Sequence, residues 1–455
     1  MLKPNVLKNG INIVRIPRTN CNTVVVGLVV NTGSTVEEGY FPQGISHLVE
    51  RIFWRGTYKH SSSKHLNLAL ESMGGSFYSF TTQESMQFYI TVPATNQYKA
   101  ISFLAEIIQR SYFDARDVEN EKKILIEEQK QSNQNMDQEI QDISLANLYF
   151  NSSLGLPVNG FIESLNQIEH SQVIDYLSHQ FVPDKTTLVI AGNFDSKRTL
   201  ELIEQEWSIW NPKTKNFIEP IFNNDENRDL PKIHYRQRGV AQTHLAVNFI
   251  LDEGLKPMLV LQNPEGQPEV VEPTQEMIES RLHQMAVLLT LNAILGQGFS
   301  SRLWTKGIEE ELLFNKVESN LVYFSSSSFL SILANTENLQ FSFGLECIMS
   351  ILDSLKRTAV SINELAKAKE FLKGKFILEH ENLLSHVLWQ MDNYVNSSVV
   401  YEISDILEKI DKVESAQVRS MALDLFVPQR LSISTLGTAK ETRLVDKLIK
   451  KYLGS

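Results

Sequence analysis

An internal duplication constrains the fold of this chain more than any other feature of its sequence. The segment "QVIDYLSHQFVPDKTTLVIAGNFDSKRTLELIEQEW" is echoed by a later one, "QVRSMALDLFVPQRLSISTLGTAKETRLVDKLIKKY". Three matched pairs are each 245 residues apart (417−172, 426−181, 437−192): Gln172 and Gln417, Phe181 and Phe426, Gly192 and Gly437. A constant offset over this length predicts two copies of one structural unit.

Each copy is predicted to be an α+β unit with its own core. Both echoing segments have the pattern helix, Phe-Val-Pro, strand, glycine, helix. A chain of 455 residues has room for more than one domain, since one domain takes roughly 150 residues. The polar stretch "NNDENRDLPK", Asn223–Lys232, is predicted to join the copies. This gives predicted domains at residues 1–222 and 233–455.

The second copy is predicted to carry an extra loop. The strand "TVVVGLVVNTGS" has a weaker echo in "THLAVNFILDEG", with Thr23 opposite Thr243 at an offset of 220, which is 25 less than 245. The extra residues are expected near residues 252–276, a stretch with four prolines, six acidic residues and one lysine. This composition is typical of a surface loop, either a solvated connector or an element that binds a partner.

Composition excludes several classes of protein. The chain is 42% hydrophobic and 21% charged, as ordinary soluble proteins are. It has no apolar run near the ~18 residues of a membrane helix and no signal-peptide pattern, so we expect a cytoplasmic protein without membrane insertion. Only Cys21 and Cys347 occur, which argues against a disulfide framework and a thiolate zinc site. The net charge of −11, without a basic stripe, argues against nucleic acid as a partner.

Two predicted helices carry the residues with the clearest chemistry. In "GISHLVERIFWRGT", His47, Glu50 and Arg51 share one helix face, because positions i, i+3 and i+4 are neighbours. In "DARDVENEKKILIEEQK", Glu121 and Glu128 are seven residues apart, about two turns, and so share a face as well. An H-x-x-E-H helix binds zinc through its two histidines, uses the glutamate as general base and needs a third ligand from elsewhere.

The sequence resembles the pitrilysin/insulinase family of inverted zinc metallopeptidases, which includes the mitochondrial processing peptidase and the core subunits of the bc1 complex. In that family, a glutamate ligand follows H-x-x-E-H after about 74 to 80 residues, with another glutamate seven residues before it. Here Glu128 follows Arg51 after 76 intervening residues (128−51−1), and Glu121 stands at the earlier position. The stretches "LKNGINIVRIP", "MGGSFYSFTTQES" and "ILGQGFSSRLW" resemble the family's opening strand, substrate-side edge strand and second-domain helix start.

This resemblance covers nearly the whole chain and implies a fold. We expect two homologous α+β domains, each a mostly antiparallel sheet covered by helices, in a clamshell arrangement. Residues 1–222 would form a peptidase-like domain with a degenerate zinc motif. Residues 233–455 would form the homologous C-terminal domain.

The zinc motif departs from the family pattern at one position. Arg51 stands where the second zinc histidine belongs, and a guanidinium has no lone pair and keeps its positive charge. His47 and Glu128 then leave two vestigial metal ligands, fewer than zinc sites use. Glu50 is a vestigial general base, and Glu121 is a vestigial neighbour of the ligand. We therefore expect no cofactor, or zinc if the chain is active after all.

The second half departs as well. The family's second domain lends an arginine and a tyrosine, seven residues apart, to hold the substrate and stabilise the transition state. An ungapped alignment of "SSRLWTKGIEEELLFNKV" puts Ile308 and Asn315 at these positions. Both parts of the catalytic apparatus are thus incomplete.

Arg51 itself has two interpretations. Without a metal, the glutamates of the site would crowd negative charge together, and an arginine can offset this charge through forked hydrogen bonds. On this hypothesis Arg51 replaces the zinc electrostatically and pairs with Glu128 or Glu50. The alternative is an arginine that points into solvent from the end of its helix.

Three functions remain open. The favoured one is a non-catalytic subunit that pairs with an active, zinc-bearing homologue and binds peptide or unfolded polypeptide in a shared chamber. The second is a structural subunit of a larger assembly, as the bc1 core proteins are. The third is an active metalloendopeptidase with an atypical zinc site.

Overall fold

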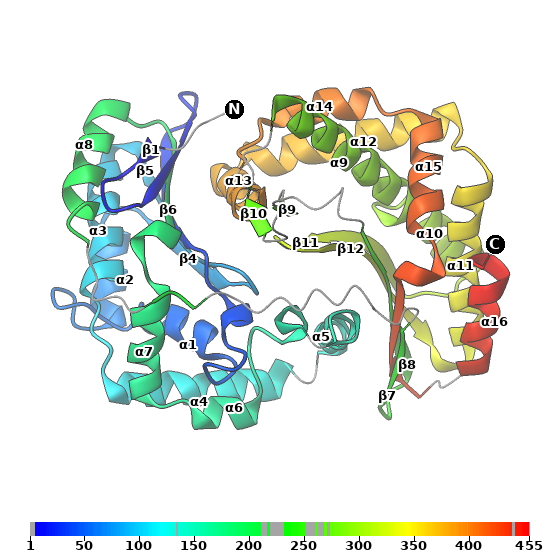
Figure 1. Cartoon of the computed structure of the whole chain (residues 1–455), viewed down its shortest axis with the longest axis horizontal. Coiled ribbons are helices and arrows are strands. Elements are labelled where there is room, and N and C mark those ends of the chain that lie inside the picture. Colours follow the sequence, from blue (N-terminus) through cyan, green and yellow to red (C-terminus); the bar gives the residue numbers. More distant parts are fainter. Residues whose placement is uncertain are drawn as a thin grey trace. The chain divides into compact units, whose positions relative to one another are not determined.

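The computed structural model describes residues 5–132, 135–150, 152–210, 216–218, 232–251, 260–262, 268–270, 274–397, 399–438 and 442–454. These residues divide into two compact units. The first unit takes its residues from 1–132, 151–223 and 380–395, and the second from 133–150, 224–379 and 396–455. Figure 1 shows the elements of both, coloured along the sequence.

The sheet of the first unit has the strand order β1-β2-β6-β3-β5-β4. All neighbouring strands are antiparallel except β2 and β6. The central strand β3 is an almost continuous run of buried apolar residues, as expected for a strand covered on both faces. β4 lies at the edge, where the sequence predicted an edge strand. The strands are β1 (Asn5–Val6), β2 (Asn12–Pro17), β3 (Thr23–Val30), β4 (Ser76–Thr81), β5 (Met86–Pro93) and β6 (Thr186–Gly192).

Helices cover this sheet and enclose the core of the unit. α3 packs on β3, β5 and α8, while α1 packs on β4, α4 and α7. Apolar side chains from these elements, such as Leu28, Phe88, Leu104 and Trp207, are buried together. The helices are α1 (Ile45–Ile52), α2 (Ser63–Ser72), α3 (Gln97–Arg110), α4 (Ala115–Ser132), α6 (Ile162–Gln167), α7 (His170–Gln180), α8 (Ser196–Trp207) and α13 (Leu383–Ser397).

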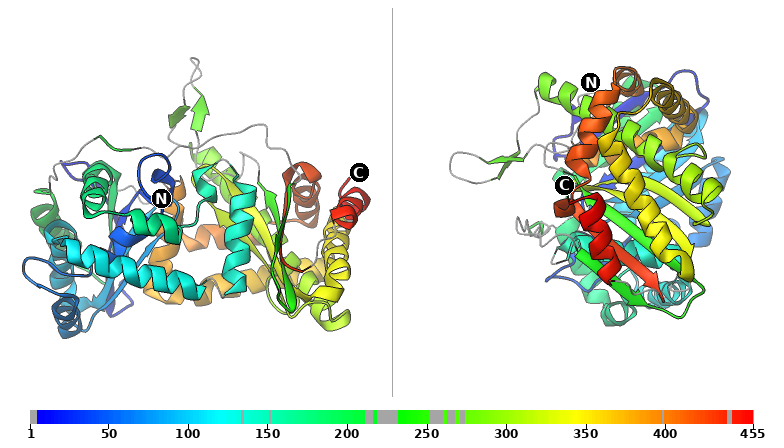
Figure 2. Two further views of the ribbon diagram at one scale, coloured as in Figure 1. Left: turned by 90° about the horizontal axis from the view of Figure 1, so that it is seen from below. Right: turned by 90° about the vertical axis from the view of Figure 1, so that its right-hand side faces the viewer.

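The second unit repeats this plan. Its sheet has the order β11-β12-β8-β13-β7, again with one parallel pair, β7 and β13. A separate hairpin of β9 and β10 projects from the body of the unit (Figure 2). The strands are β7 (Lys232–Gln237), β8 (Gln242–Ile250), β9 (Val260–Gln262), β10 (Pro268–Val270), β11 (Lys316–Tyr323), β12 (Ser328–Glu337) and β13 (Leu431–Gly437).

Long helices pack on the second sheet. α9 and α15 lie together, and α11 contacts both α15 and α16. A short π-helical stretch, Thr305–Glu310, follows α10. The helices are α5 (Met136–Leu148), α9 (Gln275–Gly296), α10 (Arg302–Trp304), α11 (Phe341–Arg357), α12 (Ile362–Glu381), α14 (Ile403–Asp411), α15 (Ser415–Leu425) and α16 (Thr442–Tyr452). Within the described part of the chain, no helix is long and apolar enough to span a membrane.

The predicted duplication and fold class are confirmed. Both units are α+β, with mostly antiparallel sheets of matching strand order. The offset between the echoing strands near the start of each copy needs a correction of one residue. Val30 pairs with Thr186, whereas Phe249 pairs with Leu431, which is 245 residues beyond Thr186. Equivalent positions in β3 and β8 therefore differ by 219 (249−30) rather than 220.

Two helices belong to the unit that their sequence position does not suggest. α5 lies in the first half of the sequence, before α6, α7, β6 and α8. It nevertheless packs on β8 and β13 of the second unit. Its Asn147 donates from Nδ2 to the hydroxyls of Ser432 (2.9 Å) and Ser434 (3.2 Å). Conversely, Asp392 of α13 accepts a hydrogen bond from Gln87 of the first unit at 3.3 Å. Each sheet is thus covered partly by a helix from the other half of the sequence.

Two sequence predictions fall largely outside the described residues. Of the predicted junction at 223–232, only residue 232 is described. Of the predicted extra loop near 252–276, the structure describes β9, β10 and the residues from 274 onward. Both predictions remain predictions.

Candidate functional site

A buried carboxylate fixes the start of α1. Glu37 accepts hydrogen bonds from the backbone N–H groups of Gly44 (2.8 Å) and Ser46 (2.9 Å). Gly44 has a φ of 92°, a conformation that favours glycine. Burial raises the pKa of Glu37 to about 8, against the opposing effect of these bonds. The first turn is therefore anchored from outside the helix, which sets the direction of the side chains that follow.

Arg51 lies between the two glutamates of α4. Its Nε donates to Oε1 of Glu121 at 2.6 Å, and its Nη1 donates to Oε2 of Glu128 at 2.9 Å. The predicted pairing with Glu128 is confirmed, and the predicted common face of the two glutamates is present. Two details differ from the hypothesis, because Glu121 is a second partner and Glu50 is not a hydrogen-bonding partner of the guanidinium.

Arg55 is a member of the cluster that the sequence analysis missed. Its Nη2 forms an ion pair with Oε2 of Glu121, whose side chain is only 2% exposed. Two guanidiniums therefore compensate one buried carboxylate, which would be costly to leave unpaired. The available signal was spacing, since Arg55 follows Arg51 by four residues and continues its face beyond the end of α1 at Ile52.

Glu50 and His47 form the other part of the site. The Ser79 hydroxyl, from edge strand β4, donates to Oε1 of Glu50, whose side chain is 7% exposed. Burial raises the pKa of Glu50, while the Ser79 bond and the positive charge of Arg51 lower it. His47 Nε2 lies 4.0 Å from Glu50 Oε2. Burial, followed by the charge of Arg51, lowers the pKa of His47 to about 4, so this imidazole is neutral at neutral pH.

The two predicted positions of the second unit lie around the start of β11. Ile308 is half-buried in the π-helical stretch, and Asn315 is an exposed residue directly before the strand. The backbone N–H of Asn315 donates to the carbonyl of Asn335 at 2.9 Å. An isoleucine side chain has no hydrogen-bond donor, and an asparagine amide is shorter than a tyrosine and carries no phenol. These residues cannot supply the arginine and tyrosine chemistry.

The donor set does not fit zinc. Zinc sites in proteins use three or four nitrogen, sulfur or oxygen ligands. In the described part of the chain, no group of three or more histidine, cysteine, aspartate or glutamate side chains is arranged to hold a metal. One of the two remaining candidates, Glu128, is engaged by the guanidinium of Arg51. A dication at this point would meet a positive charge that it would first have to displace.

Two models of one protein family match consecutive parts of the sequence. Residues 13–160 match insulinase (peptidase family M16), and residues 167–372 match the peptidase M16 inactive domain. The chain belongs to the peptidase M16 family. The description of the second model concerns that domain within the family and does not by itself assign activity to this M16 protein.

Known proteins similar to this M16 chain include one described as an uncharacterized zinc protease and one described as a subunit of a mitochondrial peptidase. YmxG of Bacillus subtilis, an uncharacterized zinc protease, is 26% identical over 428 residues, which are 94% of this chain and 96% of that protein. The mitochondrial-processing peptidase subunit beta of Dictyostelium discoideum is 25% identical over 206 residues, which are 45% and 44% of the two chains.

Solved structures share the fold of this M16 chain. A protease from Helicobacter pylori has a TM-score of 0.81 at 17% identity, covering 96% of this chain and 99% of that one. A peptidase M16 inactive domain from Pseudomonas fluorescens has a TM-score of 0.78 at 14% identity, with coverage of 96% and 98%. At these identities the likeness concerns the fold alone.

Proposed function

We propose that this M16 protein is a non-catalytic subunit that binds peptide or unfolded polypeptide and pairs with an active, zinc-bearing homologue. The observation that carries the proposal is the double hydrogen bonding of Arg51. Its guanidinium bonds both Glu121 and Glu128, the carboxylates that the family pattern assigns to the metal ligand and its neighbour. The positive charge that zinc supplies in the family comes here from the protein itself.

The remaining residues of the site support this proposal. A zinc peptidase needs a metal-bound water and a carboxylate that takes its proton. Glu50 is buried and accepts a hydrogen bond from the Ser79 hydroxyl. Neither this hydroxyl nor the nearby Arg51 guanidinium can bind a water and lower its pKa as a metal does. His47 is neutral, but it stands beside a guanidinium rather than a second imidazole. The chain's own groups therefore bind one another instead of activating water.

Peptide binding does not depend on the zinc ligands. Among the described residues, β4 is the last strand in the order of its sheet, so no strand from that part of the chain pairs with one side of its backbone. An extended peptide can add to such an edge through main-chain hydrogen bonds. Tyr78, in the middle of β4, is 46% exposed and can contact a peptide laid along the strand. A subunit without catalytic chemistry can thus retain a surface that holds polypeptide.

Zinc content and peptide cleavage test the non-catalytic part of the proposal. After dialysis, the purified chain should hold less than about a tenth of an equivalent of zinc, because two ligands and a cation make a poor site. It should not cleave a quenched fluorescent peptide library. Near-stoichiometric zinc, or cleavage that is lost in Glu50→Gln, would show that the protein is an active metalloendopeptidase with an atypical site.

Purification from the native source tests the partner. A co-purifying homologue with an intact H-x-x-E-H motif, in a stable complex with this chain, is the expected result. Recovery of the chain in a membrane complex without such a homologue would replace the proposal with a structural role. Recovery of the chain alone, with no binding of unfolded polypeptide, would contradict the partner role as well.

A further inference from the structure

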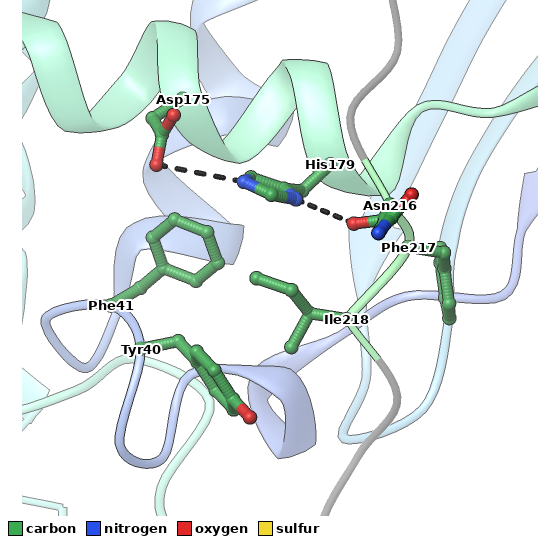
Figure 3. Close-up of a pocket in the computed structure, with 7 residues that line it drawn as sticks. All are labelled: Tyr40, Phe41, Asp175, His179, Asn216, Phe217 and Ile218. Carbon is green, nitrogen blue, oxygen red and sulfur yellow. Dashed lines mark hydrogen bonds and ion pairs between the residues drawn. The ribbon is translucent and has the colours of Figure 1, made fainter.

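A pocket in the first unit is lined by none of the residues of the arginine–glutamate cluster of α1 and α4. It has a volume of about 410 Å³, within the roughly 300–1,000 Å³ of small-ligand pockets. Its walls come from the loop before α1, from α7 and from a short stretch after α8 (Figure 3). The lining residues are Tyr40, Phe41, Asp175, His179, Asn216, Phe217 and Ile218.

Two hydrogen-bond acceptors of α7 converge in this pocket. Asp175 and His179 are four residues apart on one helix face, and both side chains point into the space drawn in Figure 3. His179 Nδ1 lies 2.6 Å from the carbonyl oxygen of Asn216. Because a carbonyl can only accept, Nδ1 carries the hydrogen, and an imidazole with a single N–H hydrogen has its lone pair on the other nitrogen, here Nε2. This lone pair faces the Asp175 carboxylate.

The spacing of these acceptors suits a donor nitrogen. His179 Nε2 and Asp175 Oδ2 are 3.9 Å apart, too far for a direct hydrogen bond. One nitrogen atom can nevertheless lie about 2.9 Å from both atoms at once. An ammonium group has three donors and no acceptor, and a carboxylate has about four acceptor directions, so Asp175 can accept it beside other partners.

The other walls suit an apolar stem. Phe41 lies edge-to-face against the His179 ring, with 6.3 Å between the centroids. Tyr40 is 57% exposed, and the Ile218 side chain points toward Phe41 and Tyr40 (Figure 3). Aromatic faces also attract cations within about 6 Å. The pocket thus combines a polar end with two acceptors and a body of aromatic and aliphatic carbon.

These walls are held in place by contacts within the unit. The backbone N–H groups of Tyr40 and Phe41 both donate to the Glu37 carbonyl, at 3.1 and 2.9 Å. On the opposite side, Gln180 Nε2 donates to the Ile218 carbonyl at 3.3 Å, and the Lys185 ammonium lies 4.6 Å from the Phe217 ring centroid. A pocket fixed in this way loses little conformational entropy when a ligand enters.

We propose that this pocket binds a primary alkylammonium group, with the nitrogen between Asp175 and His179 and its carbon stem against Phe41, Tyr40 and Ile218. The chemistry is shared by free aliphatic amines and by the side chain of a lysine in a peptide. The site is separate from the arginine–glutamate cluster of α1 and α4. It therefore does not depend on whether the protein is catalytic.

Calorimetric titration of the full chain at about pH 8 tests the proposal. The probes are n-pentylamine, which carries the cation, 1-pentanol, a neutral analogue of similar shape, and an acetylated, amidated tripeptide with a central lysine. We expect n-pentylamine to bind saturably and at least about tenfold more tightly than 1-pentanol, as hydrogen bonds to charged groups imply. Binding of the tripeptide as well would identify lysine as an accepted source of the group.

Matched variants make the result specific. Asp175→Asn should weaken n-pentylamine binding about tenfold. Asp184→Asn, which makes the same charge change at an exposed position outside the pocket, should leave it unchanged. If Asp175→Asn does not fold, Tyr40→Ala replaces it, with weaker binding expected. Equal binding of amine and alcohol, equal weakening by both aspartate variants, or no amine binding up to about 100 mM would overturn the proposal.

Discussion

Replacing Arg51 by histidine gives the sharpest test of the proposed electrostatic role of the guanidinium. In zinc-free buffer the change removes two charge-assisted hydrogen bonds. The bond to Glu121 involves a carboxylate that is 2% exposed and should contribute about 1.5–3 kcal/mol. The bond to Glu128 involves a side chain that is 49% exposed, so solvent screening limits it to about 1 kcal/mol or less. Together, the free energy of unfolding should fall by about 1.5–4 kcal/mol and no further, because Arg55 still compensates Glu121.

Zinc should reverse much of this loss. Arg51→His puts two histidines and Glu50 on one face of α1, with Glu128 free to act as third ligand. A metal that binds only the folded state stabilises it by about 2.7 kcal/mol at a hundredfold excess over its dissociation constant. The charge of the Arg51 guanidinium is, after burial, the second cause of the lowered pKa of His47, and the substitution removes it. That imidazole remains unprotonated at about pH 7.5, as metal binding requires.

Urea denaturation of wild type, Arg51→His and Arg51→Met, each with zinc or EDTA, measures the effect. Arg51→Met is the matched control, since it loses the same hydrogen bonds without gaining a ligand. Only Arg51→His should be stabilised by zinc. If Arg51→His unfolds cooperatively, holds no zinc by elemental analysis and is insensitive to the metal, then His47 and Glu128 do not converge as inferred. Stabilisation of the wild type by zinc would equally refute the electrostatic replacement.

Three further predictions follow from other parts of the first and second units. Glu37→Ala should lower the free energy of unfolding by about 2–5 kcal/mol, since it leaves two buried backbone N–H groups unpaired; urea denaturation showing less than about 1 kcal/mol would contradict this. Burial, followed by the nearby His380 and Arg18, lowers the pKa of His386 to about 4 from 6.5, so its contribution to stability is present above pH 6.5 and is lost as pH falls through about 4. His386→Phe should retain up to about 3 kcal/mol of stability that the wild type loses over this range in thermal unfolding, and equal pH slopes would exclude the assignment. Adding Ile308→Arg and Asn315→Tyr to Arg51→His should raise peptide cleavage above that of Arg51→His alone by about 10²-fold at most. The reason is that such donors stabilise the developing oxyanion. No difference between the two variants in a fluorescent peptide assay would show that these positions do not face the substrate.

Local periodicity accounts for the parts of the site that the sequence predicted. A helix places residues three, four and seven apart on one face, so the common faces of His47 with Arg51 and of Glu121 with Glu128 required no tertiary information. The family resemblance implied that the two helices lie together, and the pairing then followed from charge, because a guanidinium near two carboxylates binds one of them. The missing detail was which carboxylate is buried. Glu121 is 2% exposed and Glu128 is 49% exposed, a difference set by packing around α4.

Long-range packing accounts for what the sequence did not predict. α5 and α13 cover sheets of the opposite half, and an amphipathic helix pattern does not say which sheet its apolar face will meet. The pocket of the first unit is a similar case. Tyr40, His179 and Ile218 come from three separated segments that share no motif, so only the folded chain brings their side chains together.

The charges of the α1–α4 cluster bear on how readily this site would accept a metal ion. Two guanidiniums, Arg51 and Arg55, meet two carboxylates, Glu121 and Glu128, so this part of the cluster is balanced without an added ion. In a zinc site the same carboxylates would face a dication, and the charge balance between α1 and α4 would depend on that ion. Arg55 changes the expectation for repair, because it stays on Glu121 after Arg51 is replaced. In Arg51→His, one arginine rather than two would then oppose the charge of a zinc ion. The additional change Arg55→Ala should increase the zinc affinity of Arg51→His. It should also lower the stability of the zinc-free protein, because Glu121 is then left unpaired. If Arg55→Ala instead weakens zinc binding, the second arginine supports the ligand geometry, and electrostatic competition does not limit the zinc affinity of this site.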